Sequence, residues 1–161
     1  MHAPRVQLER LYREALPALL AYFRRQPALA GAAEDLVQDT FVRALRQAER
    51  LECSVSARAY VFGIARHVGI DWLRRRRAEV ELTDAVAAEP ARGDDRMEGI
   101  RAAIAALPEP HRETLMLRLQ QELSYEEIAE VLGVPVGTVR SRLHHAVRRL
   151  QEALHSERDE T

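Results

Sequence analysis

The chain contains no lysine, so all 24 of its basic side chains are arginines, and it has a single cysteine, Cys53. One cysteine excludes an internal disulfide and is typical of a protein that works in a reducing cytoplasm. No apolar run approaches the roughly 20 residues that a membrane span requires, which argues against membrane insertion. The first residues also lack the apolar core of a signal peptide, so we expect a cytoplasmic protein.

Aromatic residues and glycines are scarce as well. Aromatic residues make up 5% of the chain and glycines number 7, whereas 47% of the residues are hydrophobic. This composition is typical of small helical bundles, and 161 residues are enough for one medium domain or two small ones. No alternating pattern is long enough to predict a strand, so the sequence predicts an all-α fold.

The net charge of −1 conceals an uneven distribution of charge along the chain. Residues 1–77 hold 14 arginines and 8 acidic residues, a net charge of +6. Residues 78–98 hold 2 arginines and 7 acidic residues, or −5, and residues 99–161 hold 8 and 10, or −2. The basic first segment favours a nucleic-acid partner, and the acidic middle segment lacks a helical period. We therefore expect two small helical domains, 1–77 and 99–161, joined by a flexible acidic linker over 78–98.

The hydrophobic pattern predicts three helices in the first domain and four in the second. The predicted helices span about residues 6–26, 32–50, 56–77, 97–106, 110–120, 124–132 and 136–154.

The last two predicted helices carry the most specific motif. Ser124 and Glu127 have the spacing of a capping box, which marks the start of the first helix of the pair. Gly133 supplies the backbone freedom that a tight turn needs, and apolar residues then recur over 139–150 with helical spacing. This pattern is typical of a helix-turn-helix, whose second helix enters the major groove of DNA. The candidate DNA-contacting residues of that second helix are Val136, Thr138, Val139, Arg140, Ser141, Arg142, His145, Arg148 and Arg149.

Polar residues recur on one side of the second predicted helix. Asp35, Gln38 and Asp39 have helical spacing, whereas the apolar residues of this helix, including Leu45, can face a core. Such a polar strip is either a solvated face or a surface that docks on another protein.

Aromatic residues and arginines alternate along the third predicted helix, which ends in four consecutive arginines at 74–77. Rings that stack on bases and arginines that follow phosphates suit single-stranded nucleic acid. The alternative is structural, because Tyr60 and Trp72 can belong to a core stripe and arginines are favourable at a helix C-terminus. We expect most of both aromatic side chains to be buried.

Taken together, in this order and spacing, these segments resemble the extracytoplasmic-function class of bacterial RNA polymerase sigma factors, over residues 8–77 and 97–154. The resemblance implies a subunit that binds the clamp and flap regions of core RNA polymerase and recognises the −10 and −35 elements of promoters. It implies promoter DNA, both duplex and single-stranded, as a partner and an anti-sigma factor as a regulator. It implies no cofactor, no metal and no catalysis by this chain.

The resemblance also implies roles for individual residues. It places polymerase docking on Asp35, Leu36, Gln38, Asp39 and Phe41. It places recognition and melting of the −10 element on Arg58, Tyr60, Arg66, His67, Asp71, Arg74, Arg75 and Arg76. It places −35 recognition on the helix-turn-helix residues named above, and residues 48–56 are the candidate loop that holds an unstacked −10 base.

Two other classes of function remain as alternatives. A stand-alone helix-turn-helix regulator would bind duplex DNA by itself, usually as a symmetric dimer, and would not need the polar strip. An enzyme has less support, because neither Glu126 with Glu127 nor His144 with His145 has metal-ligand spacing. Cys53 could in principle sense metal or oxidant, although a lone cysteine is more often a small apolar filler.

Overall fold

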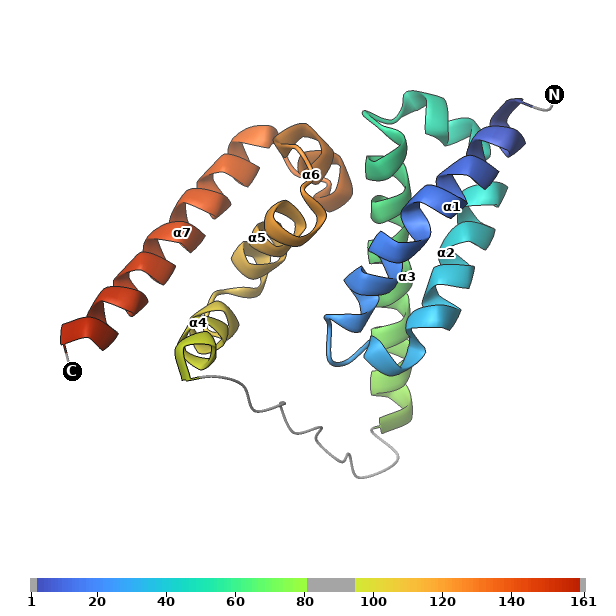
Figure 1. Ribbon diagram of the computed structural model, residues 1–161. Helices are drawn as coiled ribbons and strands as arrows, with labels where there is room; N and C mark the ends of the chain where they lie inside the picture. The colour runs from blue at the N-terminus through green and yellow to red at the C-terminus, as the bar shows by residue number, and fades with distance from the viewer. Residues whose placement is uncertain (1–2, 81–94, 160–161) are drawn as a thin grey trace. The chain divides into compact units, whose positions relative to one another are not determined.

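The structure is a computed structural model that describes residues 3–80 and 95–159. Within these ranges the chain forms α-helices and short 3-10 helices and no strand, which confirms the all-α prediction (Figure 1). None of the described helices combines the length and the apolarity needed to cross a membrane.

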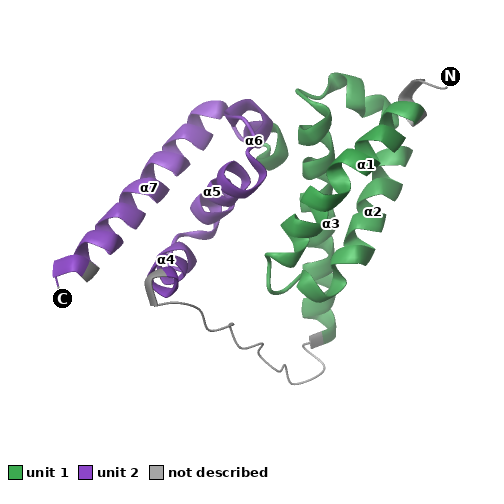
Figure 2. Cartoon of the chain, in the orientation of Figure 1, with its two compact units in different colours: residues 1–88, 130–133 green, residues 89–129, 134–161 purple. Residues whose placement is uncertain are grey.

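The chain divides into two compact units, residues 1–88 with 130–133 and residues 89–129 with 134–161 (Figure 2). Residues 130–133 complete the helix Tyr125–Leu132 and form the turn before the next helix of the second unit. Most of the predicted linker, residues 81–94, lies outside the described residues. Its two ends are helical, since helices cover the chain up to Val80 and again from Asp95.

The first unit packs α1 (Ala3–Arg24), α2 (Ala33–Arg46) and α3 (Ala57–Val80) around one apolar core. The 3-10 helices η1 (Ala30–Ala32) and η2 (Ala48–Cys53) lie in the two connections. α2 therefore ends before the predicted residue 50, and α3 continues past residue 77 because no glycine or proline interrupts it there.

Each helix of the first unit buries one stripe of apolar side chains. In α1 this stripe follows the 3.6-residue period, and in α2 the side chains of Leu36, Val37 and Phe41 are buried beside it. Leu45 contradicts the prediction, because 51% of its surface is exposed and it faces away from the core. The buried side chains of α1 are Leu8, Leu11, Ala15, Leu19 and Phe23.

Tyr60 joins the start of α3 to the end of α2. Its side chain is 6% exposed, and its hydroxyl lies 2.8 Å from the carbonyl oxygens of both Ala44 and Gln47, to which it donates. These carbonyls lie at the C-terminal end of α2, where the last carbonyl groups of a helix have no amide donor within the helix. Burial raises the pKa of the Tyr60 hydroxyl, and the negative charge of Glu49 raises it further, so the group remains a donor.

The second unit contains α4 (Asp95–Ala105), α5 (Glu109–Gln121), α6 (Tyr125–Leu132) and α7 (Val136–Asp159). α4 and α5 both pack against α7, which is longer than predicted. Its apolar stripe is buried as the sequence predicted, since Val139 and Ala146 are fully buried and Leu143 is 7% exposed.

Local hydrogen bonds set the geometry of the helix-turn-helix. The Ser124 amide donates to the Glu127 carboxylate at 2.7 Å, and the Glu127 amide donates to the Ser124 hydroxyl at 3.1 Å, which confirms the capping box. Gly133 adopts a left-handed φ of 65°, as its predicted place in the turn requires. Arg118 donates to the Leu123 carbonyl at 2.9 Å and lies over the ring of Tyr125, so α5 fixes where α6 begins.

Tyr60→Phe tests the tie between α2 and α3. We expect it to lower the free energy of unfolding of the first unit by about 1–2 kcal/mol, because two carbonyl oxygens lose a buried donor. Fluorescence of Trp72, the one tryptophan of the chain, measures this unfolding in urea. Ser124→Ala, in the other unit, is the matched control and should leave the Trp72 transition in place. An unchanged transition for Tyr60→Phe would mean that the tie contributes nothing.

Candidate nucleic-acid interface

The polar strip of α2 is exposed, as the sequence predicted. Asp35, Gln38 and Asp39 all face solvent. Leu36 and Phe41, which were predicted to dock beside them, are instead buried at 1% and 7% exposure. Neighbouring positions on a helix point about 100° apart, so these two side chains face the core and are not available to a partner.

The exposed side of α2 continues beyond the polar residues with apolar side chains. Val42 and Leu45 follow Gln38 at helical spacing and are 45% and 51% exposed. We call the five residues Asp35, Gln38, Asp39, Val42 and Leu45 the α2 strip. Sequence reasoning missed its apolar end because leucine suggested a core position, although extending the polar spacing by one turn reaches Val42 and by two turns reaches Leu45.

The residues predicted to contact the −10 element do not share one face of α3. His67, Asp71 and Arg74 lie on one side, because they are spaced by four and three residues. Arg58 is exposed but precedes His67 by about two and a half turns, which places it on the opposite side. Tyr60 is buried in its contact with α2, and this burial removes it from the set of surface residues that can stack on a base.

The C-terminal part of α3 presents a ring and several cations. Arg74, Arg75 and Arg76 are exposed, and Arg66 is partly exposed. The Arg76 guanidinium lies 5.0 Å from the centre of the Trp72 ring, and Trp72 is mostly buried, as predicted, while part of its surface stays exposed. A ring beside arginines is the arrangement that single-stranded nucleic acid requires.

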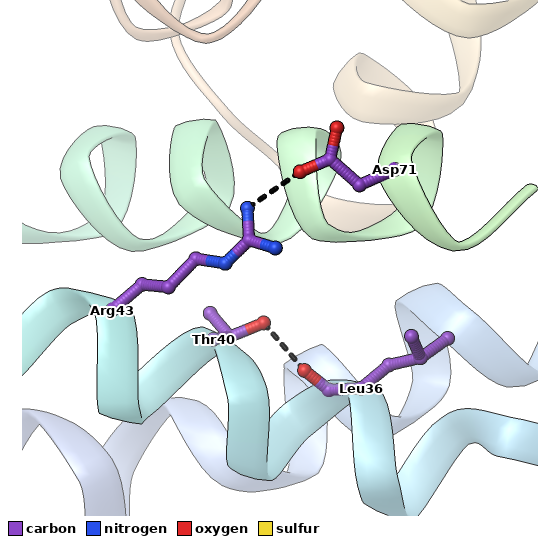
Figure 3. A network of polar contacts seen from close by, with 4 residues as sticks. All are labelled: Leu36, Thr40, Arg43 and Asp71. Atoms are coloured by element: carbon purple, nitrogen blue, oxygen red, sulfur yellow. Dashed lines mark hydrogen bonds and ion pairs between the residues drawn. The ribbon is translucent and has the colours of Figure 1, made fainter. Parts of the chain in front are cut away.

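Asp71 is held by an arginine of α2. Its carboxylate accepts a hydrogen bond of 2.8 Å from Arg43 (Figure 3). This hydrogen bond lowers the pKa of Asp71, and the positive charges of Arg43, Arg74 and Arg75 lower it further. Asp71 therefore fixes α3 against α2 next to His67, a role that the sequence alone did not indicate.

The connection between α2 and α3 leaves most of its side chains exposed. Leu51 is buried and anchors η2, whereas Glu49, Arg50 and Cys53 face solvent. Ser56 caps α3, because its hydroxyl accepts a hydrogen bond of 3.0 Å from the Ala59 amide. Among the described residues, no group of three or more His, Cys, Asp or Glu side chains is placed to hold a metal ion.

The exposed face of α7 is basic. Arg140, Ser141, His145, Arg148 and Arg149 face solvent, and Val136, Thr138 and Arg142 are partly exposed. Val139 is fully buried, so its predicted contact with DNA is wrong, since the apolar stripe of α7 points into the second unit. Arg148 also forms an exposed ion pair of 3.2 Å with Glu152.

A residue outside the predicted set lies against this face. The ring of His111, in the first turn of α5, is 6.0 Å from the ring of His145, centre to centre. Burial lowers the pKa of His111, and the positive charges of His145, Arg142 and Arg149 lower it further. No pattern in the sequence links residue 111 to α7, because the two meet only through the packing of α5.

Asp71→Asn tests the ion pair between α2 and α3. Because the folded state lowers the pKa of Asp71, the pair stabilises the first unit at neutral pH and is lost as the pH falls through that lowered value. We expect the variant to lose about 0.5 kcal/mol of unfolding free energy near pH 7, a small effect because both side chains are partly exposed. Urea titrations followed by Trp72 fluorescence should show this difference shrinking toward pH 3. A difference that is the same at both pH values would contradict an ionic role.

Comparison with known proteins identifies both units. Residues 11–79 match the family model of sigma-70 region 2, and residues 97–150 match that of sigma-70 region 4. The chain is 35% identical to the RNA polymerase sigma factor YlaC of Bacillus subtilis, over 97% of this chain and 96% of that protein. It is 35% identical to the ECF RNA polymerase sigma factor SigL of Mycobacterium tuberculosis, over 89% of this chain and 86% of that protein.

A solved structure agrees with these relatives. The sigma factor RpoE of Bartonella quintana, in complex with the anti-sigma factor NepR, matches with a TM-score of 0.71 and 32% identity. The match covers 92% of this chain and 97% of that one. The chain therefore belongs to the extracytoplasmic-function class of the sigma-70 family and is a sigma factor that directs transcription initiation.

Proposed function

We propose that this chain binds core RNA polymerase through the α2 strip and recruits it to promoters without catalysing a reaction. The observation that carries this proposal is the strip itself, whose charged and apolar side chains stay exposed while the opposite side of α2 supplies the core. Exposed apolar side chains rimmed by polar ones are typical of a protein-binding surface. The carboxylates of Asp35 and Asp39 suit cationic partners on the clamp of the polymerase.

The first unit is proposed to read and open the −10 element. Arg74, Arg75 and Arg76 provide cations along α3 beside the exposed side chain of His67, and Trp72 offers a partly exposed ring on which a base can stack. Residues 48–56, which Tyr60 and Ser56 hold in place, are the candidate loop for an unstacked base. The cost of unstacking is a few kcal/mol, which contacts with such a loop can offset.

The second unit is proposed to bind duplex DNA at the −35 element. Arg140 and Ser141 lie near the start of α7 and face solvent, as residues that enter the major groove must. Arginine pairs with guanine edges or with phosphates. The flap of the polymerase is the proposed protein partner of this unit.

Regulation by an anti-sigma factor is a further part of the proposal. The similar sigma factor RpoE of Bartonella quintana is seen in complex with the anti-sigma factor NepR. An anti-sigma factor that covers the α2 strip would compete directly with the polymerase. Because polymerase and chromosome share one compartment in bacteria, we place the site of action in the cytoplasm.

Run-off transcription tests the proposed function. Core polymerase would be supplied with a library of genomic fragments, with and without this protein. We expect a defined set of transcripts that start only when the protein is present. If no start site depends on the protein, the proposal fails. Tight, sequence-specific binding of duplex DNA by the protein alone would favour a stand-alone regulator instead.

Substitutions in the α2 strip test polymerase docking. We expect Asp35→Arg and Gln38→Ala each to weaken binding to core polymerase by about 1–3 kcal/mol, because each removes interface hydrogen bonds. Pull-down titration measures the affinity, and circular dichroism confirms that the helices are intact. Glu9→Arg, an exposed charge reversal on α1, is the matched control. If both strip variants bind as the control does, the strip is merely a solvated face.

A further inference from the structure

One side of α7 carries a row of four polar side chains, and His111 contacts one of them, His145. Thr138, Arg142, His145 and Arg149 recur at helical spacing, and we call them the α7 flank. His111 comes from the first turn of α5, and its ring makes an edge contact with that of His145 at 6.0 Å between centres and 69° between planes. The flank is therefore completed by a side chain from a different helix.

The two ring nitrogens of His111 have different surroundings. Nδ1 is buried and has no hydrogen-bond partner among the residues that the structure describes. A buried N–H without an acceptor is costly, so the proton belongs on Nε2 and the buried Nδ1 keeps its lone pair. Nε2 is then the ring atom that a ligand can reach, and it is a donor.

The charges around His111 also favour the neutral ring. Burial is the largest cause of its lowered pKa, followed by the positive charges of His145, Arg142 and Arg149, all from α7. DNA that docks on the flank would offset those charges but would exclude more water from the ring. Burial, the largest cause, remains when DNA is bound and continues to favour the neutral ring.

The arginines of the flank lack acidic partners. Within the described part of the chain, neither Arg142 nor Arg149 forms an ion pair with a carboxylate. By contrast, Arg148 on the next face is paired with Glu152. Two unpaired guanidinium groups beside a neutral donor make a site for a phosphate group, to which all of them can donate.

We propose that His111 binds a backbone phosphate of promoter DNA by donating a hydrogen bond from Nε2, as an uncharged ligand between the arginines of the α7 flank. This inference rests on the proposed contact between the second unit and duplex DNA. It adds a residue of α5 to the DNA-binding surface. Because His111 is uncharged, its contribution to the affinity for DNA does not depend on counterion release.

Salt dependence distinguishes an uncharged ligand from a cation. The experiment measures binding of holoenzyme, assembled from core polymerase and the full chain, to a promoter fragment found by run-off transcription. We expect His111→Phe to weaken binding about fivefold at every salt concentration, because one neutral hydrogen bond is lost. Arg149→Ala should instead reduce the slope of log affinity against log salt by about 1. His111→Gln should bind nearly as wild type, since its amide nitrogen can replace Nε2 as a donor.

Each other outcome overturns a defined part of the inference. A reduced salt slope for His111→Phe would mean that the ring is charged in the complex. Full affinity for His111→Phe, with Arg149→Ala impaired, would mean that His111 only packs against α7. If Arg142→Ala and Arg149→Ala are also without effect, DNA does not contact the flank. The proposed −35 contact of the second unit then fails as well. The proposal that the protein directs transcription is tested separately by run-off transcription and is not affected by this result.

Nuclear magnetic resonance of the unmodified chain keeps the inference testable if His111→Phe perturbs folding. Ring nitrogen spectra of nitrogen-15-labelled protein should show His111 as the neutral Nε2–H form near pH 7. Addition of a duplex that carries the promoter's −35 segment should shift the Nε2–H proton and leave Nδ1 unprotonated. A protonated Nδ1, or an Nε2–H signal that stays in place at a duplex concentration that shifts the backbone amide signals of α7, would overturn the proposal.

Discussion

The burial of one apolar stripe per helix is the constraint on which both units depend. An α-helix turns by about 100° per residue, so a stripe at every third or fourth position leaves the other sides open. In α2 the buried residues Leu36 and Phe41 force Asp35 and Leu45 outward, and in α7 the buried Val139 forces Arg140 and Ser141 outward. The surfaces proposed to bind polymerase and DNA are therefore set by the packing of the two cores.

Polar contacts then decide where these surfaces lie within each unit. Tyr60 and the Arg43–Asp71 pair hold α3 against α2, so the basic end of α3 and the connection before it keep a fixed position. In the second unit, the capping box of Ser124 and Glu127 and the contacts of Arg118 fix the start of α6. Beyond the roughly 0.5–2 kcal/mol that each contributes to stability, such contacts hold the helices of each unit in one orientation.

Local patterns in the sequence predicted the parts of the structure that depend on local forces. The capping box, the left-handed Gly133 and the buried stripe of α7 each follow from residues within one or two turns. The burial of Tyr60 was predicted, but its hydrogen bonds, the exposure of Leu45 and the position of His111 were not, because they depend on other elements. A leucine at the edge of a stripe is buried only if a neighbouring helix covers it. A histidine of α5 joins the face of α7 only through packing between helices.

The bonds of Tyr60 end on backbone carbonyl oxygens rather than on side chains of the connection that they hold. The path of the chain between α2 and α3 therefore depends little on which residues occupy it, apart from Leu51 and the cap at Ser56. A segment of this kind can change its exposed side chains over evolution while its position stays the same. If this connection binds the −10 base, as proposed, sigma factors with this fold would acquire new promoter preferences through a few substitutions in one short segment.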